Sequence, residues 1–171
     1  MLVTVKSVTP GTVWPPDSRL VDPRDFSDWI DGSPAVAHFL AYDVTSGGRE
    51  LVGHVMVDHM EQVLATRADD GQTVWRSTVP EVWRAEGDES TRSLVRVLAV
   101  APDWSGRRLG RLLLRQALQH AIRVHKRAPV LQVMDSLASA RALYTHEGGV
   151  ELPAMPSRTG PSMIPVEFVS Y

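Results

Sequence analysis

The chain has 171 residues, of which 43% are hydrophobic and 22% charged, a balance that is ordinary for one soluble globular domain. Its formal net charge of −2 gives no general attraction to nucleic acid or to an anionic membrane. The absence of cysteine excludes disulfides, a thiol nucleophile and cysteine-based metal sites. No apolar run approaches the roughly 20 residues of a membrane span, and the N-terminus does not look like a signal peptide. We therefore expect a single cytoplasmic domain over residues 1–171, with no membrane or nucleic-acid partner.

Hydrophobic periodicity and turn residues predict a mixed α/β order of elements. The predicted strands cover residues 3–8, 35–44, 50–59, 93–101 and 130–134, with a sixth near 150 and a last one over 166–171. The predicted helices cover residues 22–32, from 107 or 108 to about 126, and from 135 or 136 to 147. The two strands that flank the long helix are expected to run parallel. Residues 60–92 are expected to be an insertion, either a short helix with an extra hairpin or a functional flap.

The predicted strand over 50–59 carries polar side chains on one face. His54, Met56 and Asp58 point to one side, because side chains alternate along a strand. This polar face has three possible explanations: it faces a ligand, it is exposed to solvent, or its hydrogen bonds are satisfied within the protein. The sequence does not decide among them.

The stretch 96–114 carries the clearest functional signal. It predicts a strand that ends at a proline, a short loop, and the start of the long helix. Two glycines and three arginines lie at that junction: Gly106, Gly110, Arg107, Arg108 and Arg111. Helix N-termini present amide N–H groups and the positive end of the helix dipole, both of which suit phosphate. A solvated arginine face is the plainer alternative.

Two blocks of sequence between about 94 and 150 share a known pattern. The first is Leu-Ala-Val-Ala-Pro at 98–102, followed by Ser-Gly-Arg-Arg-Leu-Gly at 105–110. The second is Leu-Gln-Val at 131–133, followed by Ala140, Leu143, Tyr144 and Gly148. In order and spacing they resemble two motifs of the GNAT superfamily of acetyl-CoA-dependent N-acetyltransferases. The resemblance implies an α/β (α+β) fold with a mixed, mostly antiparallel sheet of about seven strands, a parallel splayed pair (strands 4 and 5) and flanking helices.

The same resemblance implies where acetyl-CoA, the co-substrate, would bind. The residues implied at its pyrophosphate are Ser105, Gly106, Arg107, Arg108, Gly110 and Arg111. The main chain of Leu98, Ala99 and Val100 would hold the pantetheine arm, and a backbone N–H there would stabilise the oxyanion. Tyr144 would protonate the departing CoA thiolate as a general acid, although simple packing beneath its helix is the alternative. No metal is implied.

The chain departs from the family motifs in ways that bear on chemistry. Arg108 replaces a glycine, and a left-handed backbone there would be disfavoured. Leu137 replaces a common asparagine, and Ser105 replaces an arginine or glutamine. The usual positions of a general base hold Leu94 and Arg96, neither of which accepts a proton at neutral pH.

The general base is therefore expected elsewhere, or is not needed because the amine arrives neutral. The candidates, acting directly or through water, are Asp58, His59, Glu61 and Glu81. Arg96 would pair with a carboxylate of the acceptor if it points into the cleft.

The predicted function is transfer of an acetyl group from acetyl-CoA to a primary amine by direct attack in a ternary complex. The lack of cysteine favours direct attack over an acyl-enzyme. A module that binds acyl-CoA as a sensor or partner, without turnover, is the alternative that the missing base motivates. A nucleotide-binding loop ranks last, since the P-loop and dinucleotide signatures are absent. The amine acceptor and a homodimer both stay open.

Overall fold

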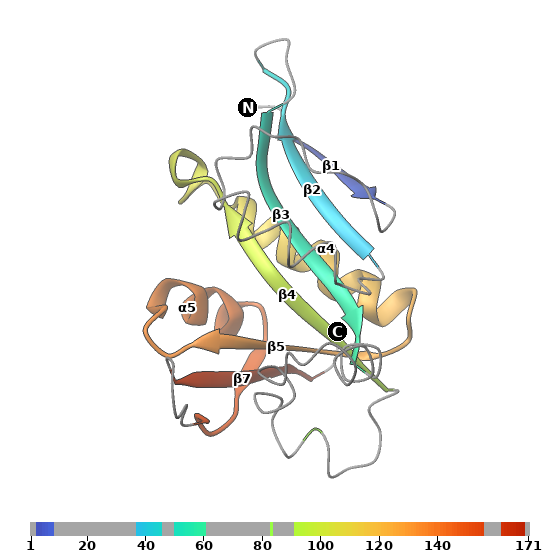
Figure 1. Ribbon diagram of the computed structural model, residues 1–171, viewed down its shortest axis with the longest axis vertical. Coiled ribbons are helices and arrows are strands. Elements are labelled where there is room, and N and C mark those ends of the chain that lie inside the picture. Colours follow the sequence, from blue (N-terminus) through green and yellow to red (C-terminus); the bar gives the residue numbers. More distant parts are fainter. Residues whose placement is uncertain are drawn as a thin grey trace, which may run out of the picture. The chain divides into compact units, whose positions relative to one another are not determined.

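The structure is a computed structural model that describes residues 3–8, 37–45, 50–60, 83, 91–155 and 162–169. Its elements are β1 (Val3–Val8), β2 (Ala37–Asp43), β3 (Glu50–His59), β4 (Arg92–Val100), the 3-10 helix η2 (Pro102–Trp104), α4 (Leu109–Arg123), β5 (Ala128–Met134), α5 (Ala138–His146), β6 (Gly149–Glu151) and β7 (Met163–Phe168) (Figure 1). The seven strands follow the order β1-β2-β3-β4-β5-β7-β6 in one mixed sheet, which confirms the predicted fold class. The helix predicted over 22–32 lies outside the described residues.

The chain divides into two compact units, each built from two separate segments. The first unit contains Met1–Asp58 and Val95–Gln119, and the second contains His59–Leu94 and His120–Tyr171. The expectation of one domain over the whole chain stays a prediction. In the part of the chain that the structure describes, no helix is long and apolar enough to cross a membrane.

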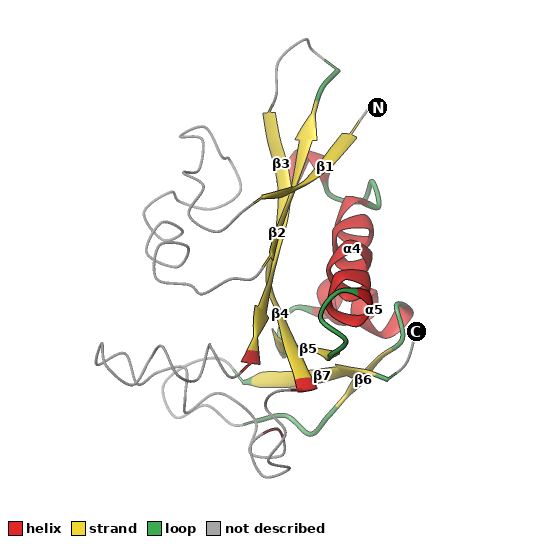
Figure 2. Ribbon diagram, turned by 90° about the vertical axis from the view of Figure 1, so that its right-hand side faces the viewer, coloured by secondary structure: helices red, strands yellow, loops and turns green. Residues whose placement is uncertain are grey.

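The first unit is a layer of strands with α4 along one face, as Figure 2 shows. β1 pairs antiparallel with β2, and β2 with β3, which confirms the predicted hairpin. The buried residues of α4 in this unit are Leu109, Leu113, Leu114, Ala117 and Leu118. A Cβ added at Gly53 would lie 2.8 Å from Leu113 Cδ1, so α4 packs on the face of β3 that carries Gly53.

The opposite face of β3 carries polar side chains, and they are buried. His54 and Asp58 lie on this face, and the β2–β3 register places His38 opposite Met56 beside them. Asp58 forms an ion pair with Arg96 of β4. Solvent exposure is therefore the wrong explanation for this polar face.

Burial makes the histidines of this face resist protonation. Desolvation lowers the pKa of His54 from 6.5 to about 3, and the nearby His38 adds to the shift. Desolvation, followed by the charge of Arg96, also lowers the pKa of His38. Both imidazoles are therefore neutral at pH 7.

The second unit is built around β7. β5 and β6 both pair antiparallel with β7. On its other edge β5 pairs in parallel with β4, through Arg92–Leu94 and Ala128–Val130, which confirms the parallel pair predicted around the long helix.

The last strand begins three residues before its predicted start at residue 166. Pro165 therefore lies inside β7, although proline is unusual in a central strand. Its carbonyl still takes part in pairing, because it accepts the N–H of Leu152 at 2.8 Å. The prediction was wrong because it treated this proline as a break.

Trp83 lies in the core of the second unit. The buried cluster there consists of Met60, Trp83, Leu94 and Val130, with Leu152 packed against it. The indole N–H of Trp83 donates to Glu167 Oε1 at 2.6 Å, so the one polar atom of this buried ring is satisfied. Trp83 thus anchors the predicted insertion to the second unit by packing.

We predict that Trp83→Ala lowers the free energy of unfolding by about 3–5 kcal/mol, because it leaves a cavity and removes the hydrogen bond that the indole donates to Glu167. Urea denaturation followed by circular dichroism measures the change. Val124→Ala, at a position 63% exposed, is the control and should change stability by less than about 0.5 kcal/mol. Equal effects of the two substitutions would contradict the assigned core.

We predict that His54 makes the protein less stable in acid. Its pKa is lowered in the folded state, so below about pH 6.5 the unfolded chain binds the extra proton and folding is disfavoured. Between about pH 7.5 and pH 5 this linkage amounts to about 2 kcal/mol. Denaturation at both pH values should show a smaller loss of stability in His54→Met than in the wild type. The same loss in both proteins would contradict the prediction.

Candidate functional site

The part of the candidate site on the first unit begins at the end of β4. Within the described residues, the parallel pairing of β4 ends at Leu94, so the main chain of Leu98–Val100 extends beyond it. The side chains of Leu98–Val100 are half-buried. Val97 has a φ of 53°, an outlier for a β-branched residue, so the regular strand conformation is interrupted just before them. This segment can offer main-chain groups to an extended ligand.

The connection from β4 to α4 is anchored on β3. The N–H of Ala101 donates to the carbonyl of Val52 at 2.9 Å. Trp104 at the end of η2 is buried, and the guanidinium of Arg107 lies 5.1 Å from the centroid of its ring. This distance allows a cation–π contact, which holds one arginine of the connection near its backbone.

Two residues of this connection have left-handed backbones. Gly106 has a φ of 74° and Arg108 a φ of 65°. α4 consequently begins at Leu109, and the N–H of Leu112 donates to the Arg108 carbonyl at 3.1 Å. The expectation that the helix starts at Arg107 or Arg108 is wrong, because a left-handed residue cannot continue a right-handed helix. Arg108 instead keeps the conformation that glycine adopts most readily.

The residues predicted for pyrophosphate binding meet in this one turn. Ser105, Gly106, Arg107 and Arg108 are exposed, whereas Gly110 and Arg111 are half-buried. The first N–H groups of α4 have no acceptor within the helix, and turns that contain left-handed residues are typical of anion-binding backbone. Together with the arginine charges, this makes the turn from 105 to 111 a site suited to a phosphate group.

Tyr144 lies in α5 of the second unit and is buried. Desolvation raises the pKa of its phenol to about 12, so the hydroxyl keeps its proton at neutral pH. A Cβ at Gly149 would lie only 2.9 Å from the Tyr144 carbonyl and 2.7 Å from Val166 Cγ1. Glycine at this position therefore lets β6 approach the last turn of α5.

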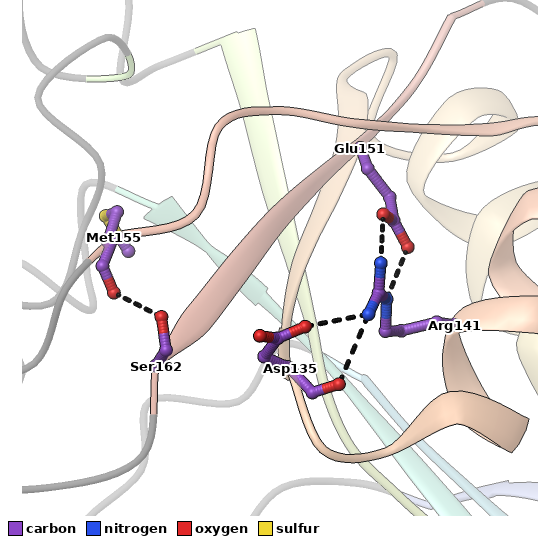
Figure 3. A network of polar contacts seen from close by, with 5 residues as sticks. All are labelled: Asp135, Arg141, Glu151, Met155 and Ser162. Carbon is purple, nitrogen blue, oxygen red and sulfur yellow. Dashed lines mark hydrogen bonds and ion pairs between the residues drawn. The ribbon is translucent and has the colours of Figure 1, made fainter.

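The start of α5 differs from the prediction that Asp135 or Ser136 caps it. The N-cap is Leu137, whose side chain makes no capping hydrogen bond. The Asp135 carboxylate instead accepts a hydrogen bond from Arg141, which also binds Glu151 (Figure 3). Sequence analysis missed Arg141, because its partners lie six and ten residues away and form no local pattern.

Two of the four candidate bases lie in the described residues, and Asp58 is the more enclosed. Its carboxylate is fully buried and ion-paired with Arg96. Arg96 thus has a partner within the protein, and its pairing with a carboxylate of the acceptor stays a prediction. Glu61 and Glu81 lie outside the described residues.

The other described candidate, His59, belongs to a histidine cluster that sequence analysis missed. The ring of His125 lies 4.5 Å from those of His59 and His120, and the Nε2 atoms of His120 and His125 are 3.1 Å apart. Desolvation, then His120 and His59, lower the pKa of His125 to about 4, so that it is neutral at pH 7. Across the described ranges, no group of three or more histidine, aspartate or glutamate residues is arranged to hold a metal ion.

Comparisons with solved structures agree with the fold described above. The IAA acetyltransferase from Bacillus cereus is similar with a TM-score of 0.60 and 17% identity, over 98% of this chain and 99% of that one. The ribosomal-protein-S18-alanine N-acetyltransferase from Escherichia coli has a TM-score of 0.57 and 15% identity, over 99% and 96% of the two chains. A structure of the NatC complex bound to Gag peptide and CoA has a TM-score of 0.61 and 14% identity, over the whole of both chains. At these identities the likeness is one of fold.

Sequence comparison with curated proteins finds no match, but a family model does match. The model described as "Acetyltransferase (GNAT) family" covers residues 10–148, which is most of the chain and includes the turn and Tyr144. This match supports acyl transfer with acetyl-CoA as co-substrate. The chain belongs to the GNAT acetyltransferase family.

Proposed function

We propose that this protein moves an acetyl group from acetyl-CoA to a primary amine by direct attack in a ternary complex. The observation that carries the proposal is the turn from 105 to 111, where left-handed residues, a helix N-terminus and three arginines come together. Membership of the GNAT family makes the pyrophosphate of acetyl-CoA the ligand that this turn suits.

The main chain supplies most of the binding in this proposal. N–H groups of the turn bind the pyrophosphate, and Arg107, Arg108 and Arg111 add charge-assisted hydrogen bonds. The half-buried segment Leu98–Val100 pairs with the pantetheine arm. One of its N–H groups polarises the thioester carbonyl and holds the oxyanion that forms when the amine attacks.

Tyr144 acts at the end of the reaction. The amine nitrogen forms a bond to the thioester carbon, the tetrahedral intermediate collapses, and the carbon–sulfur bond breaks. The Tyr144 hydroxyl gives its proton to the departing thiolate, and the amine proton leaves to a base or to water. A phenol that stays protonated at neutral pH suits this role.

In this proposal, the group that accepts the amine proton is one of the candidate bases named above, or none is needed. Asp58 would have to act while its charge is balanced by Arg96. His59 lies beside another histidine, since its ring contacts that of His125. An amine that arrives neutral needs neither of them.

We predict that Tyr144→Phe lowers kcat at least about 100-fold, because the thiolate then leaves without a proton donor. The dissociation constant of acetyl-CoA should change less than about twofold, since the ring and its packing are retained. Release of CoA with a panel of primary amines, together with calorimetry, measures both quantities. Undiminished turnover in the variant would remove Tyr144 from the mechanism.

We predict that Gly106→Val raises the KM for acetyl-CoA about tenfold, because a β-branched residue disfavours the left-handed backbone by more than about 1 kcal/mol. The KM for acetyl-pantetheine, which lacks the pyrophosphate, should not change. Lys126→Val is the matched control, since Lys126 has a φ of 57° beyond the far end of α4. A similar rise in KM for both thioesters would contradict a pyrophosphate site at this turn.

A further inference from the structure

We propose that Arg141 is a positioning residue for Tyr144. Its guanidinium ties the turn before α5 to the strand after it, and so determines where the Tyr144 hydroxyl lies. This inference rests on the proposed role of Tyr144 as proton donor.

Arg141 uses all three of its guanidinium nitrogens in these contacts (Figure 3). Nε and Nη2 donate to the two carboxylate oxygens of Glu151, each at 2.9 Å, which is a bidentate pair. Nη1 donates to Asp135 at its carboxylate, at 2.7 Å, and at its carbonyl, at 3.3 Å. Because the guanidinium is planar, contacts on both sides fix its orientation as well as its position.

The position of α5 depends on such tertiary contacts. It has nine residues, and its N-cap residue, Leu137, makes no side-chain hydrogen bond to the first turn. A helix of this length is not stable alone, so tertiary contacts set its position. Arg141 supplies one by holding Asp135, two residues before Leu137, and Glu151 of β6.

Tyr144 lies three residues after Arg141 on the same short helix, so a movement of one residue moves the other. The strand that holds Arg141 also contacts Tyr144. β6 contains Glu151, and it contains Gly149, whose close approach to the Tyr144 carbonyl leaves no room for a side chain. The contacts of Arg141 with Asp135 and Glu151, called the clamp below, therefore act on the segment of α5 that carries the Tyr144 phenol.

The side chains of Arg141 and its two partners are partly exposed, so an effect on the position of Tyr144 can be distinguished from an effect on overall stability. The side chains of Arg141, Asp135 and Glu151 are 33%, 54% and 28% exposed. Ion pairs with this much solvent contribute little to overall stability. Loss of the clamp should therefore change the position of Tyr144 while the fold is kept.

The position of Tyr144 can be read without turnover. The chain has three tyrosines, so protein labelled with 13C at tyrosine Cζ gives three signals, and Tyr144→Phe identifies the one from Tyr144. In Arg141→Ala this signal should shift. The pKa of the Tyr144 phenol, read from the same signal, should fall from about 12 towards about 10 as the phenol becomes exposed to solvent. Arg123→Ala removes an exposed arginine from the last turn of α4 and should leave the signal unchanged.

Kinetics then test whether Arg141 acts through Tyr144. Arg141→Ala should lower kcat about tenfold and leave the KM for acetyl-CoA unchanged, while Arg123→Ala changes neither. In the Tyr144→Phe background, Arg141→Ala should cost less than about twofold more, because the group that it positions is gone. Arg141→Lys keeps the charge but cannot form the bidentate pair with Glu151. Its kcat should therefore lie between those of Arg141→Ala and the wild type.

An unmoved Tyr144 signal, or the same fold-loss of kcat in both backgrounds, would overturn the proposal. Should Arg141→Ala fail to fold, Glu151→Gln removes the charge of the bidentate partner and takes its place in both measurements. Absence of turnover in the wild type would refute the proposed function, and the tyrosine signal would still report whether Arg141 positions Tyr144. Undiminished turnover in Tyr144→Phe would overturn both roles.

Discussion

The left-handed backbone at Gly106 and Arg108 is the constraint on which the rest of the first unit depends. It sets Leu109 as the first residue of α4. That start places Leu113 against Gly53, so the buried face of the helix meets the sheet. A non-glycine residue pays roughly 1–2 kcal/mol for this conformation. Strain of this kind persists where the surrounding structure requires it, often at functional turns, and the turn here presents the N-terminus of α4.

The polar face of β3 balances its charges within the protein. Asp58 and Arg96 neutralise each other, and the neighbouring His38 and His54 are kept neutral by burial. Removing either partner of such a pair leaves an uncompensated buried charge, so the two residues depend on each other. This dependence explains why an arginine is compatible with a buried strand position where family members often place a base. It also means that Arg96 already has an anionic partner before any acceptor binds.

Local patterns in the sequence predicted the parts of the fold that depend on local physics. The hairpin of β2 and β3 and the apolar stripe of α4 are of this kind. The expected start of α4 failed for a local reason, the left-handed backbone of Arg108. The other failures depend on partners that no local pattern reveals. Asp135 has the chemistry of a helix cap, yet Arg141 takes its carboxylate. Pro165 has the chemistry of a strand break, yet its carbonyl pairs with Leu152. The cluster around His125 joins residues from separate elements, and spacing contains no sign of it.

Binding and proton transfer make different demands on this sequence. The proposed pyrophosphate contacts come mainly from backbone N–H groups, which every residue except proline supplies, provided that the turn keeps its shape. Arg108 keeps that shape in place of glycine, so this departure from the family motif is compatible with acetyl-CoA binding. Proton transfer instead needs one hydroxyl at one position. Tyr144 lies on a short helix whose N-cap makes no side-chain hydrogen bond, so its placement depends on side-chain contacts such as those of Arg141. Sequence variation that keeps the left-handed backbone of the turn should therefore be tolerated, whereas variation around α5 should be penalised.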